Sequence, residues 1–280
     1  MCLGQYLTGG KQLLRQCFSF RTVAHIERLT VYPVKGLDRL TVDRSRVRPG
    51  GTLEHDREFA LLDGDGERVN AKQSDRFHAL ETTYDPETVT LRVDAPERCE
   101  FALDSEDGRA EAAAWLTDAL GLDGDRRLDR NTDVGHVDRR SMGPSVISTA
   151  TIETVAGWFD DMTVESARRR LRANVEVGGV PAFWEDRFVG ENAPAFRAGD
   201  VRIEGATPCG RCVVPSRDPD TGEPTPEFRT EFLTNRQETF PEWADRDAFD
   251  HLYSLMIIAS VPEADRGETI AVGDEVELVA

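Results

Sequence analysis

The sequence has few lysines, no long apolar run and a shortage of positive charge. Lys and Arg together number 34 of its 280 residues against 52 Asp and Glu, which gives a formal charge of −18. We therefore expect no nucleic-acid partner, because wrapping DNA or RNA needs a net basic face. The same acidity argues against docking on an anionic membrane. No apolar run approaches the ~18 residues of a membrane span.

The lysine shortage indicates the solvent in which the protein works. Lys11, Lys35 and Lys72 are the only lysines, so 31 of the 34 basic residues are arginine. Many acids with few lysines are typical of proteins from very high salt, where exposed charge is screened. A GC-rich genome would also favour arginine codons, but codon bias alone does not explain a charge of −18. We expect a halophilic composition, with codon bias as the alternative.

The odd number of cysteines, five, predicts a reducing compartment. A disulfide framework needs pairs and an oxidising environment. Residues 1–24 carry Lys11, Arg15 and Arg21 and no acid, but they lack the apolar core and cleavage site of a signal peptide. We therefore expect a cytoplasmic protein with a disordered tail, or an upstream start codon, over 1–24.

Short apolar runs between turn residues predict a chain made mostly of strands. Apolar and polar residues alternate over 25–47, and Phe59–Leu62 precedes an Asp-Gly-Asp-Gly turn that predicts a hairpin. Strands are also expected at 80–84, 88–93 and 99–103. Several short strands at this spacing favour an antiparallel barrel or sandwich.

Helices are expected later in the chain, which makes the fold class mixed α+β and strand-dominated. Apolar residues share one helical face over 110–120, and Val164–Leu171 predicts another helix. Thr149 or Thr151 would cap a helix that runs through Phe159. The strands expected after residue 122 lie at 145–148, 173–177, 197–204, 212–215 and 270–279.

Cys209-Gly210-Arg211-Cys212 is the strongest local candidate for chemistry. Two thiols three residues apart can share a metal or form a redox pair, and Arg211 between them favours a thiolate, which suits a nucleophile or a soft-metal ligand. Structural zinc is disfavoured because no second CxxC is present. A thioredoxin-type pair is disfavoured because Val213-Val214-Pro215 is not a helix start. Two ordinary half-buried cysteines are the alternative.

Isolated cations stand beside the expected strand ends. They are Lys35, Arg57, Lys72 and Arg172. In a chain this acidic, convergent cations would make a local anion pocket. Two of the three lysines are among them, in a sequence that uses arginine almost everywhere else. Solvated surface charge is the alternative for any one of them. Walker, GxGxxG and GxSxG motifs are absent, so ordinary nucleotide and hydrolase folds lack support.

Taken in order, these fragments resemble two linked domains of one family. Tyr32-Pro-Val-Lys35-Gly, His55-Asp56-Arg57 and Ala71-Lys72-Gln73 look like the N-terminal β-barrel domain found ahead of MOSC domains. Later fragments resemble the MOSC domain itself, in the subgroup that contains the mitochondrial amidoxime-reducing component. These later fragments are Arg172-Ala173-Asn174-Val175, Gly199-Asp200-Val201, Cys209-Gly-Arg-Cys212, Asp218-Pro-Asp-Thr-Gly222 and Val272-Gly273-Asp274.

The resemblance runs from about His25 to the C-terminus and implies a division of the chain. Residues 25–121 would form the MOSC N-terminal β-barrel domain, and 139–280 the MOSC domain, a β-barrel with short helices. Residues 122–138, rich in charge, would form a surface connection.

The resemblance implies a molybdenum cofactor (molybdopterin) between the two domains. In this family the second cysteine of the CxxC motif is the protein ligand to molybdenum, which here is Cys212. Asn174 matches a polar residue near the metal, so Cys212 and Asn174 are the expected catalytic residues. The residues expected to contact the cofactor are Lys35, Arg57, Lys72, Ser141, Arg172, Gly210 and Arg211.

The resemblance also implies an oxidoreductase that reduces small N-hydroxylated or N-oxide compounds by oxygen abstraction at molybdenum. No cysteine cluster for an iron–sulfur centre is identified, so electrons are expected from a separate donor protein. No pyridoxal phosphate site of the kind found in cofactor sulfurases is identified either. Gly36 and Gly210 stand where some relatives have hydroxyl side chains. The alternative function is a sulfur carrier or cofactor-delivery module that uses Cys212 as a persulfide or ligand. A further alternative is a domain that keeps the fold without the activity.

Overall fold

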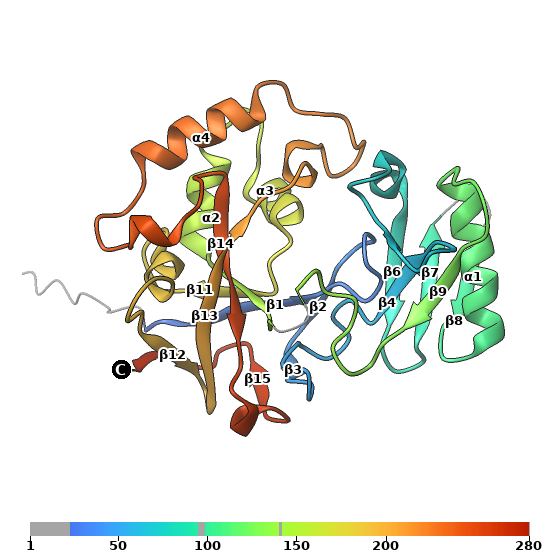
Figure 1. Cartoon of the computed structure of the whole chain (residues 1–280), viewed down its shortest axis with the longest axis horizontal. Helices are drawn as coiled ribbons and strands as arrows, with labels where there is room; N and C mark the ends of the chain where they lie inside the picture. Colours follow the sequence, from blue (N-terminus) through green and yellow to red (C-terminus); the bar gives the residue numbers. More distant parts are fainter. Residues whose placement is uncertain (1–22, 95–98, 140–141, 280) are drawn as a thin grey trace, which may run out of the picture.

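The computed structural model describes residues 23–94, 99–139 and 142–279, and the account of the fold refers to these ranges. They form sixteen strands and four α-helices (Figure 1). This confirms the mixed α+β, strand-dominated fold. The tail expected over 1–24 lies outside the described residues up to residue 22.

The largest sheet has eight strands in the order β16-β12-β13-β14-β10-β11-β1-β2. Only the neighbours β10 and β11 run parallel. A single bridge joins His25 on β1 to Glu275 beside β16. The sheet nevertheless remains open and does not form a closed barrel. The strands are β1 (His25–Val31), β2 (Leu40–Val42), β10 (Ser145–Ser148), β11 (Val175–Gly178), β12 (Ala195–Ala198), β13 (Val201–Gly210), β14 (Ser254–Ser260) and β16 (Val276–Val279).

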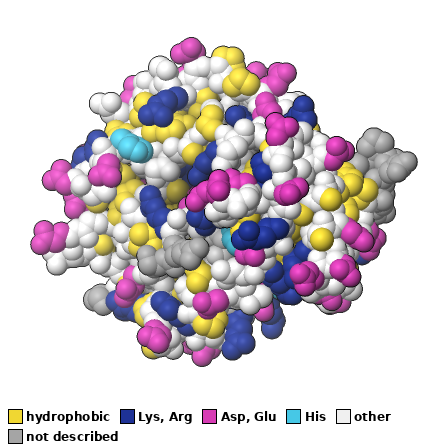
Figure 2. Space-filling model, turned by 45° about the vertical axis from the view of Figure 1, so that its right-hand side comes forward, with side chains coloured by type: hydrophobic (Ala, Val, Ile, Leu, Met, Phe, Trp, Pro, Cys, Tyr) yellow, Lys and Arg dark blue, Asp and Glu magenta, His cyan; other side chains and the backbone are white. Residues whose placement is uncertain are grey.

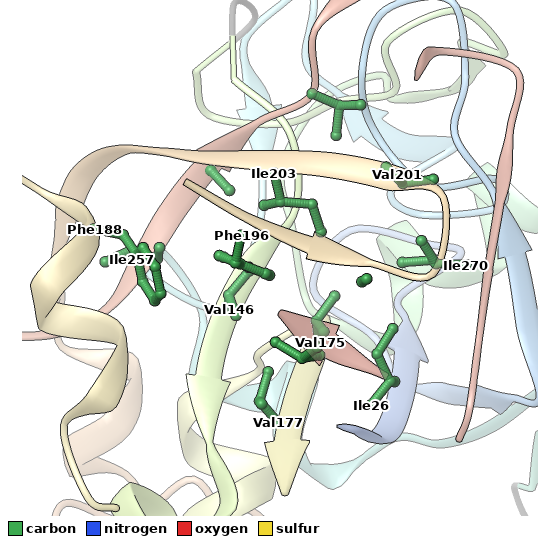
Figure 3. Packing of buried hydrophobic residues seen from close by; sticks show 14 of the residues in the cluster. Ile26, Val146, Val175, Val177, Phe188, Phe196, Val201, Ile203, Ile257 and Ile270 are labelled. Atoms are coloured by element: carbon green, nitrogen blue, oxygen red, sulfur yellow. The ribbon is translucent and has the colours of Figure 1, made fainter. Parts of the chain in front are cut away.

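A continuous apolar core packs against this sheet. Val146, Val175 and Ile203, from three different strands, are fully buried. Figure 3 shows them gathering with Phe196 and Ile257 between the strands. Burying one such side chain contributes roughly 1.5–3 kcal/mol, so this cluster fixes the register of the strands that reach the site.

Two smaller sheets and α1 (Glu106–Ala119) form the other part of the molecule, at the right of Figure 1. One has the order β5-β4-β9 and the other β6-β7-β8. Phe59, Leu91 and Leu116 join them in a second core. The strands are β4 (Phe59–Leu62), β5 (Arg68–Val69), β6 (Glu81–Asp85), β7 (Thr90–Asp94), β8 (Cys99–Ala102) and β9 (Arg127–Arg130).

Sheet membership does not follow the linear division of the chain. Strands β1 and β2 belong to the eight-stranded sheet, and β3 (Arg44–Arg46) pairs with β15 (Thr269–Ala271). The segment 122–138, expected as a surface connection, contains β9, which pairs with β4. Its charged sequence hid this strand, because only Leu128 is buried there. The domain boundaries themselves stay a prediction.

The helices begin where side chains satisfy the first backbone N–H groups. The prediction that Thr149 or Thr151 caps a helix is wrong. Helix α2 (Thr149–Ala156) is capped by Ser148, whose side chain accepts a hydrogen bond from the Thr151 N–H. Helix α3 (Val164–Leu171) has the expected bounds, with Thr163 as its cap. None of the helices in the described ranges is both long and apolar enough to cross a membrane.

Several expected strands differ from the structure. Residues 197–204 form a β12–β13 hairpin, and 270–279 form β15 and β16 with a turn between them. Residues 212–215 are not a strand. They pass into the 3₁₀ turn η3 (Val214–Ser216), because β13 has already ended at Gly210. Helix α4 (Phe228–Glu238) was not predicted, because it buries Arg236 beside Phe228 and Phe232.

A buried ionic network ties α4 to the large sheet. Arg236, fully buried, pairs with Asp186 in η2 (Trp184–Phe188) and donates to the Ser254 carbonyl on β14. The neighbouring Glu185 accepts hydrogen bonds from the Ser148 N–H at 3.1 Å and the Thr151 hydroxyl at 3.1 Å. Burial, and secondly the Asp186 carboxylate, raise the pKa of Glu185 to about 8. Burial therefore favours the neutral form of Glu185.

Replacing Glu185 with glutamine should flatten the pH dependence of stability. The pKa of a glutamate in the unfolded chain is about 4.3, whereas that of Glu185 in the native state is about 8. The contribution of Glu185 to the unfolding free energy is therefore fully present below about pH 4.3 and is lost as the pH rises through about 8. Glu185→Gln stays neutral, so between pH 5 and pH 8.5 its unfolding free energy should fall by at least about 2 kcal/mol less than that of the wild type. Urea unfolding at pH 5 and 8.5, at constant ionic strength, measures this. Glu153→Gln, which removes an exposed acid from helix α2, is the control. An unchanged pH dependence in Glu185→Gln would contradict the prediction.

Candidate functional site

A cavity of about 1000 Å³ opens where the large sheet meets the smaller sheets. Eight of the nine residues predicted for the site line it, although they lie on separate segments from residue 35 to residue 212. The ninth, Ser141, lies outside the described residues. The eight are Lys35, Arg57, Lys72, Arg172, Asn174, Gly210, Arg211 and Cys212.

The charge of the cavity is opposite to that of the chain. Nine lysines and arginines line it against six aspartates and glutamates, while the whole chain carries −18. Figure 2 shows one face of the molecule, on which basic and acidic side chains are interspersed and do not form separate regions. The local positive surplus suits one small anion and not a polyanion.

Lys35 is the most buried lysine of the cavity, with its side chain 9% exposed. Its Nζ donates to the His136 carbonyl at 2.8 Å and to Asp138 Oδ1 at 2.8 Å. Lys72 Nζ lies 3.2 Å from the other oxygen, Asp138 Oδ2. One carboxylate thus bridges two lysines that come from different turns.

These groups shift one another's protonation. Burial lowers the pKa of Lys35 to about 8, although Asp138 opposes the shift. Burial alone would raise the pKa of Asp138, but Lys35 and Lys72 outweigh it and hold that pKa well below its usual range. Asp138 is therefore ionised near neutral pH, and the charge of Lys35 depends on an anion beside it.

Two arginines are held in place by one aromatic ring. The guanidinium of Arg172 lies 4.0 Å from the centroid of the Tyr32 ring, and that of Arg57 lies 5.1 Å from it. Arg172 also donates to the Leu37 carbonyl at 2.9 Å, and Arg57 pairs with Asp56. Cation–π contacts let the ring order both cations without neutralising either.

Both arginines have unusual backbone geometry. Arg57 has φ +49° and Arg172 has φ +56°, the left-handed region that glycine normally occupies. Arg172 uses it as the C-cap of α3, where the chain turns from the helix towards β11. Such geometry costs about 1–3 kcal/mol and is retained mostly where function requires it.

The CxxC motif spans the end of β13, which contains Cys209 and Gly210, and the start of the following loop, which contains Arg211 and Cys212. Arg211 Nη1 donates towards Cys209 Sγ at 3.4 Å and Met256 Sδ at 3.4 Å, and Nη2 donates to the Leu171 carbonyl at 2.9 Å. The Arg211 guanidinium therefore contacts the first cysteine of the motif. Arg211 Nε is buried and has no hydrogen-bond partner among the described residues. Cys212 is partly buried and lines the cavity.

A metal at Cys212 would need most of its ligands from elsewhere. Within the described ranges, no group of three or more His, Cys, Asp or Glu side chains is arranged to hold a metal ion. Cys212 offers one soft thiolate, which suits a metal whose remaining ligands belong to a cofactor. This donor set fits a metal-bearing cofactor and does not form a zinc site.

Asn174 has a structural task as well as a place in the cavity wall. Its Oδ1 accepts from the Ser145 N–H at 3.1 Å and the Ser145 hydroxyl at 3.0 Å. Its Nδ2 donates to the Thr30 carbonyl at 3.0 Å. The amide therefore holds together the ends of β10, β11 and β1 at the cavity.

Sequence reasoning missed two residues of this site. Tyr32 belongs to the Tyr-Pro-Val-Lys fragment, but nothing in that fragment indicates a ring between two arginines. Asp138 lies at the end of the expected connection, where its charge resembles that of many surface acids. Only the fold brings it between Lys35 and Lys72.

Two similar proteins are both mitochondrial amidoxime reducing components, and each aligns with this chain over most of its own length. The mitochondrial amidoxime reducing component 2 of Bos taurus is 24% identical over 239 residues, covering 71% of this chain and 68% of that protein. The component 1 of Homo sapiens is 21% identical over 306 residues, covering 97% and 86%. Both are similar to this chain at low identity.

Other similarities are partial or distant. A molybdenum cofactor sulfurase of Drosophila mojavensis is 24% identical over 232 residues, which is 72% of this chain but only 29% of the sulfurase. The chain thus corresponds to less than a third of that relative. Among solved structures, the YUAD protein from Bacillus subtilis aligns with a TM-score of 0.41 at 13% identity, over 91% of this chain and 95% of that one.

Two family models match the chain in succession. Residues 23–163 match the MOSC N-terminal beta barrel domain, and residues 143–277 match the MOSC domain. Together they extend over nearly all of the described residues. The chain therefore belongs to the MOSC family, with a MOSC N-terminal beta barrel domain ahead of the MOSC domain.

Proposed function

We propose that the chain binds a molybdenum cofactor in the 1000 Å³ cavity and reduces small N-hydroxylated or N-oxide compounds, with electrons from a separate donor protein. The observation that supports this best is the convergence of Cys212 with nine lysines and arginines in one cavity of an otherwise acidic chain. The names of two relatives, both amidoxime reducing components, support the substrate class.

The residues present fit such a cofactor. Lys35, Lys72, Arg57 and Arg172 supply donors for its phosphate and pterin, and arginine forks suit phosphate in particular. Cys212 supplies the thiolate ligand to the metal. The unpaired, buried Arg211 Nε leaves a donor beside the metal-bearing loop. When bound, the cofactor would supply the two-electron redox chemistry that the proposed reaction needs.

The chain's own residues would then bind and orient the cofactor. Tyr32 keeps Arg57 and Arg172 in fixed positions, and the salt bridge with Asp56 prevents Arg57 from turning away. Asn174 acts as a positioning residue, because its whole amide is used to join strand ends. Reduction of an N–OH group consumes two electrons and two protons and releases water, so the open cavity must admit both the substrate and protons.

A sulfur carrier or cofactor-delivery module is the second candidate. The two thiols of the CxxC motif lie at the cavity, and Arg211 Nη1 lies 3.4 Å from Cys209 Sγ, so a sulfur carried on Cys212 would have a second thiol and a cation nearby. The similarity to part of a molybdenum cofactor sulfurase supports the same candidate, a sulfur carrier or cofactor-delivery module. Mass spectrometry of the native chain separates the candidates, because a labile extra sulfur on Cys212 without bound pterin would indicate a carrier.

Removing one thiol should abolish molybdenum binding, while removing the other should not. The chain is purified at high salt from a host that makes the cofactor, and Cys212→Ala is compared with the matched variant Cys209→Ala. We expect stoichiometric molybdenum in the wild type and in Cys209→Ala, and a loss of more than about 100-fold in Cys212→Ala, because losing the ligand itself costs more than losing an outer-shell partner. Plasma mass spectrometry measures the metal, and reduction of benzamidoxime by a reduced dye measures activity. Metal-free wild-type protein, or full activity in Cys212→Ala, would contradict the proposal.

Asp138 should compete with an incoming phosphate for the two lysines. Its carboxylate contacts both Nζ atoms, so phosphate must displace it. Asp138→Asn should therefore raise the affinity of the full chain, made without cofactor, for inorganic pyrophosphate by about tenfold at pH 6.5. Affinity should fall as the pH rises through about 8, where Lys35 loses its proton. Calorimetry at constant ionic strength measures both effects.

The control for this experiment is Asp133→Asn, an exposed acid in the same segment. It removes the same charge from the chain and should leave the affinity unchanged. Equal gains in both variants would mean that the effect is general electrostatics. Weaker binding by Asp138→Asn would mean that Asp138 orders the lysines and does not compete for them.

A further inference from the structure

A second cavity of about 530 Å³ lies apart from the first, and the two have no lining residue in common. It is bounded by the end of β3, the turn before β4, the end of β9 and the 3₁₀ turn η5 (Glu263–Asp265). Four arginines and one histidine line it against three glutamates. It sits where the β5-β4-β9 sheet meets the β3–β15 pair, and such junctions commonly hold ligands.

One buried carboxylate organises the basic side chains on this cavity's wall. Glu58 Oε2 accepts from Arg48 Nη2 at 2.7 Å and lies 3.2 Å from His55 Nδ1, and Glu58 Oε1 accepts from Arg130 Nε at 2.7 Å. Burial alone would raise the pKa of Glu58, but hydrogen bonds from His55 and Arg130 outweigh it and lower that pKa. A single negative charge thus holds two guanidinium groups and one imidazole, and a positive surplus remains.

Two further arginines are held by main-chain oxygens and have no acidic partner. Arg46 Nε donates to the Gly267 carbonyl at 2.9 Å. Arg266 donates to the carbonyls of Val261 at 3.1 Å and Pro49 at 2.9 Å. In the part of the chain that the structure describes, neither guanidinium has a carboxylate within 4.0 Å. Each is therefore held in position with N–H donors left over, which is the arrangement that binds carboxylate or phosphate.

The turn between the two cavities is strained. His55 has φ +62° and Arg57 has φ +49°, although neither is glycine. His55 and Glu58 line the second cavity, while Arg57 lines the first. Strain of this kind is retained where the surrounding structure requires it. An occupant of the second cavity would therefore contact the turn that carries Arg57.

We propose that the second cavity binds a small anion with two or more negative charges, carried by carboxylate or phosphate groups. Arg46 and Arg266 at the rim and Arg48 and Arg130 on the wall supply the donors. This site is independent of the proposed function, because it uses none of the residues assigned to the cofactor.

Calorimetric titration of the full chain with citrate tests the site, and inorganic phosphate in a second arm distinguishes the two kinds of anion. Ionic strength is kept constant with NaCl. The background is Lys72→Ala, which weakens the first cavity and leaves the second intact. We expect one saturable site, with affinity at least tenfold weaker after Arg46→Gln or Arg266→Gln. Arg44→Gln, on the same strand but outside the cavity, should change nothing.

Folding is checked by circular dichroism, and Arg46→Gln is the safer variant, because Arg46 is exposed and makes one main-chain hydrogen bond. Loss of binding in a folded Arg46→Gln, with binding retained in Arg44→Gln, supports the site. Absence of saturable binding in the Lys72→Ala background overturns it. Equal weakening by Arg44→Gln overturns it as well, because diffuse charge would then explain the binding.

Discussion

The proposed site depends on holding several positive side chains close together so that a net positive charge remains in the cavity. Like charges repel, and burial removes the water that would screen them. The chain meets this constraint with two devices. Asp138 bridges Lys35 and Lys72, and the Tyr32 ring lies beside both Arg57 and Arg172. An acidic surface elsewhere leaves these few cations as the positive region of the cavity.

The fold brings these devices together from distant parts of the sequence. Strand β11 pairs parallel with β10 and antiparallel with β1, which places Asn174 at the cavity. The left-handed C-cap of α3 places Arg172 beside it. The β13–β14 pairing holds the CxxC loop, because the Arg211 N–H donates to the Tyr253 carbonyl. The apolar cores fix the positions of these elements around the cavity.

Sequence patterns predicted the local elements better than the contacts between them. The bounds of α3 agree with the helix expected over Val164–Leu171, whereas α4 was missed because it buries an arginine. Strand β9 was hidden by charge, and Val213-Val214 suggested a strand where β13 had already ended. Family resemblance indicated eight of the residues that line the cavity. It did not indicate Asp138 or the role of Tyr32, because both depend on pairings across the fold.

The central claim is that a metal-bearing, phosphate-carrying cofactor occupies the first cavity with Cys212 as its protein ligand. Anomalous diffraction at the molybdenum absorption edge tests it directly, with crystals of the chain made in a host that synthesises the cofactor. The account predicts a single anomalous peak at bonding distance from Cys212 Sγ, and phosphate density beside Lys35. A peak at any other residue, or phosphate density in that cavity with no metal at Cys212, would contradict it.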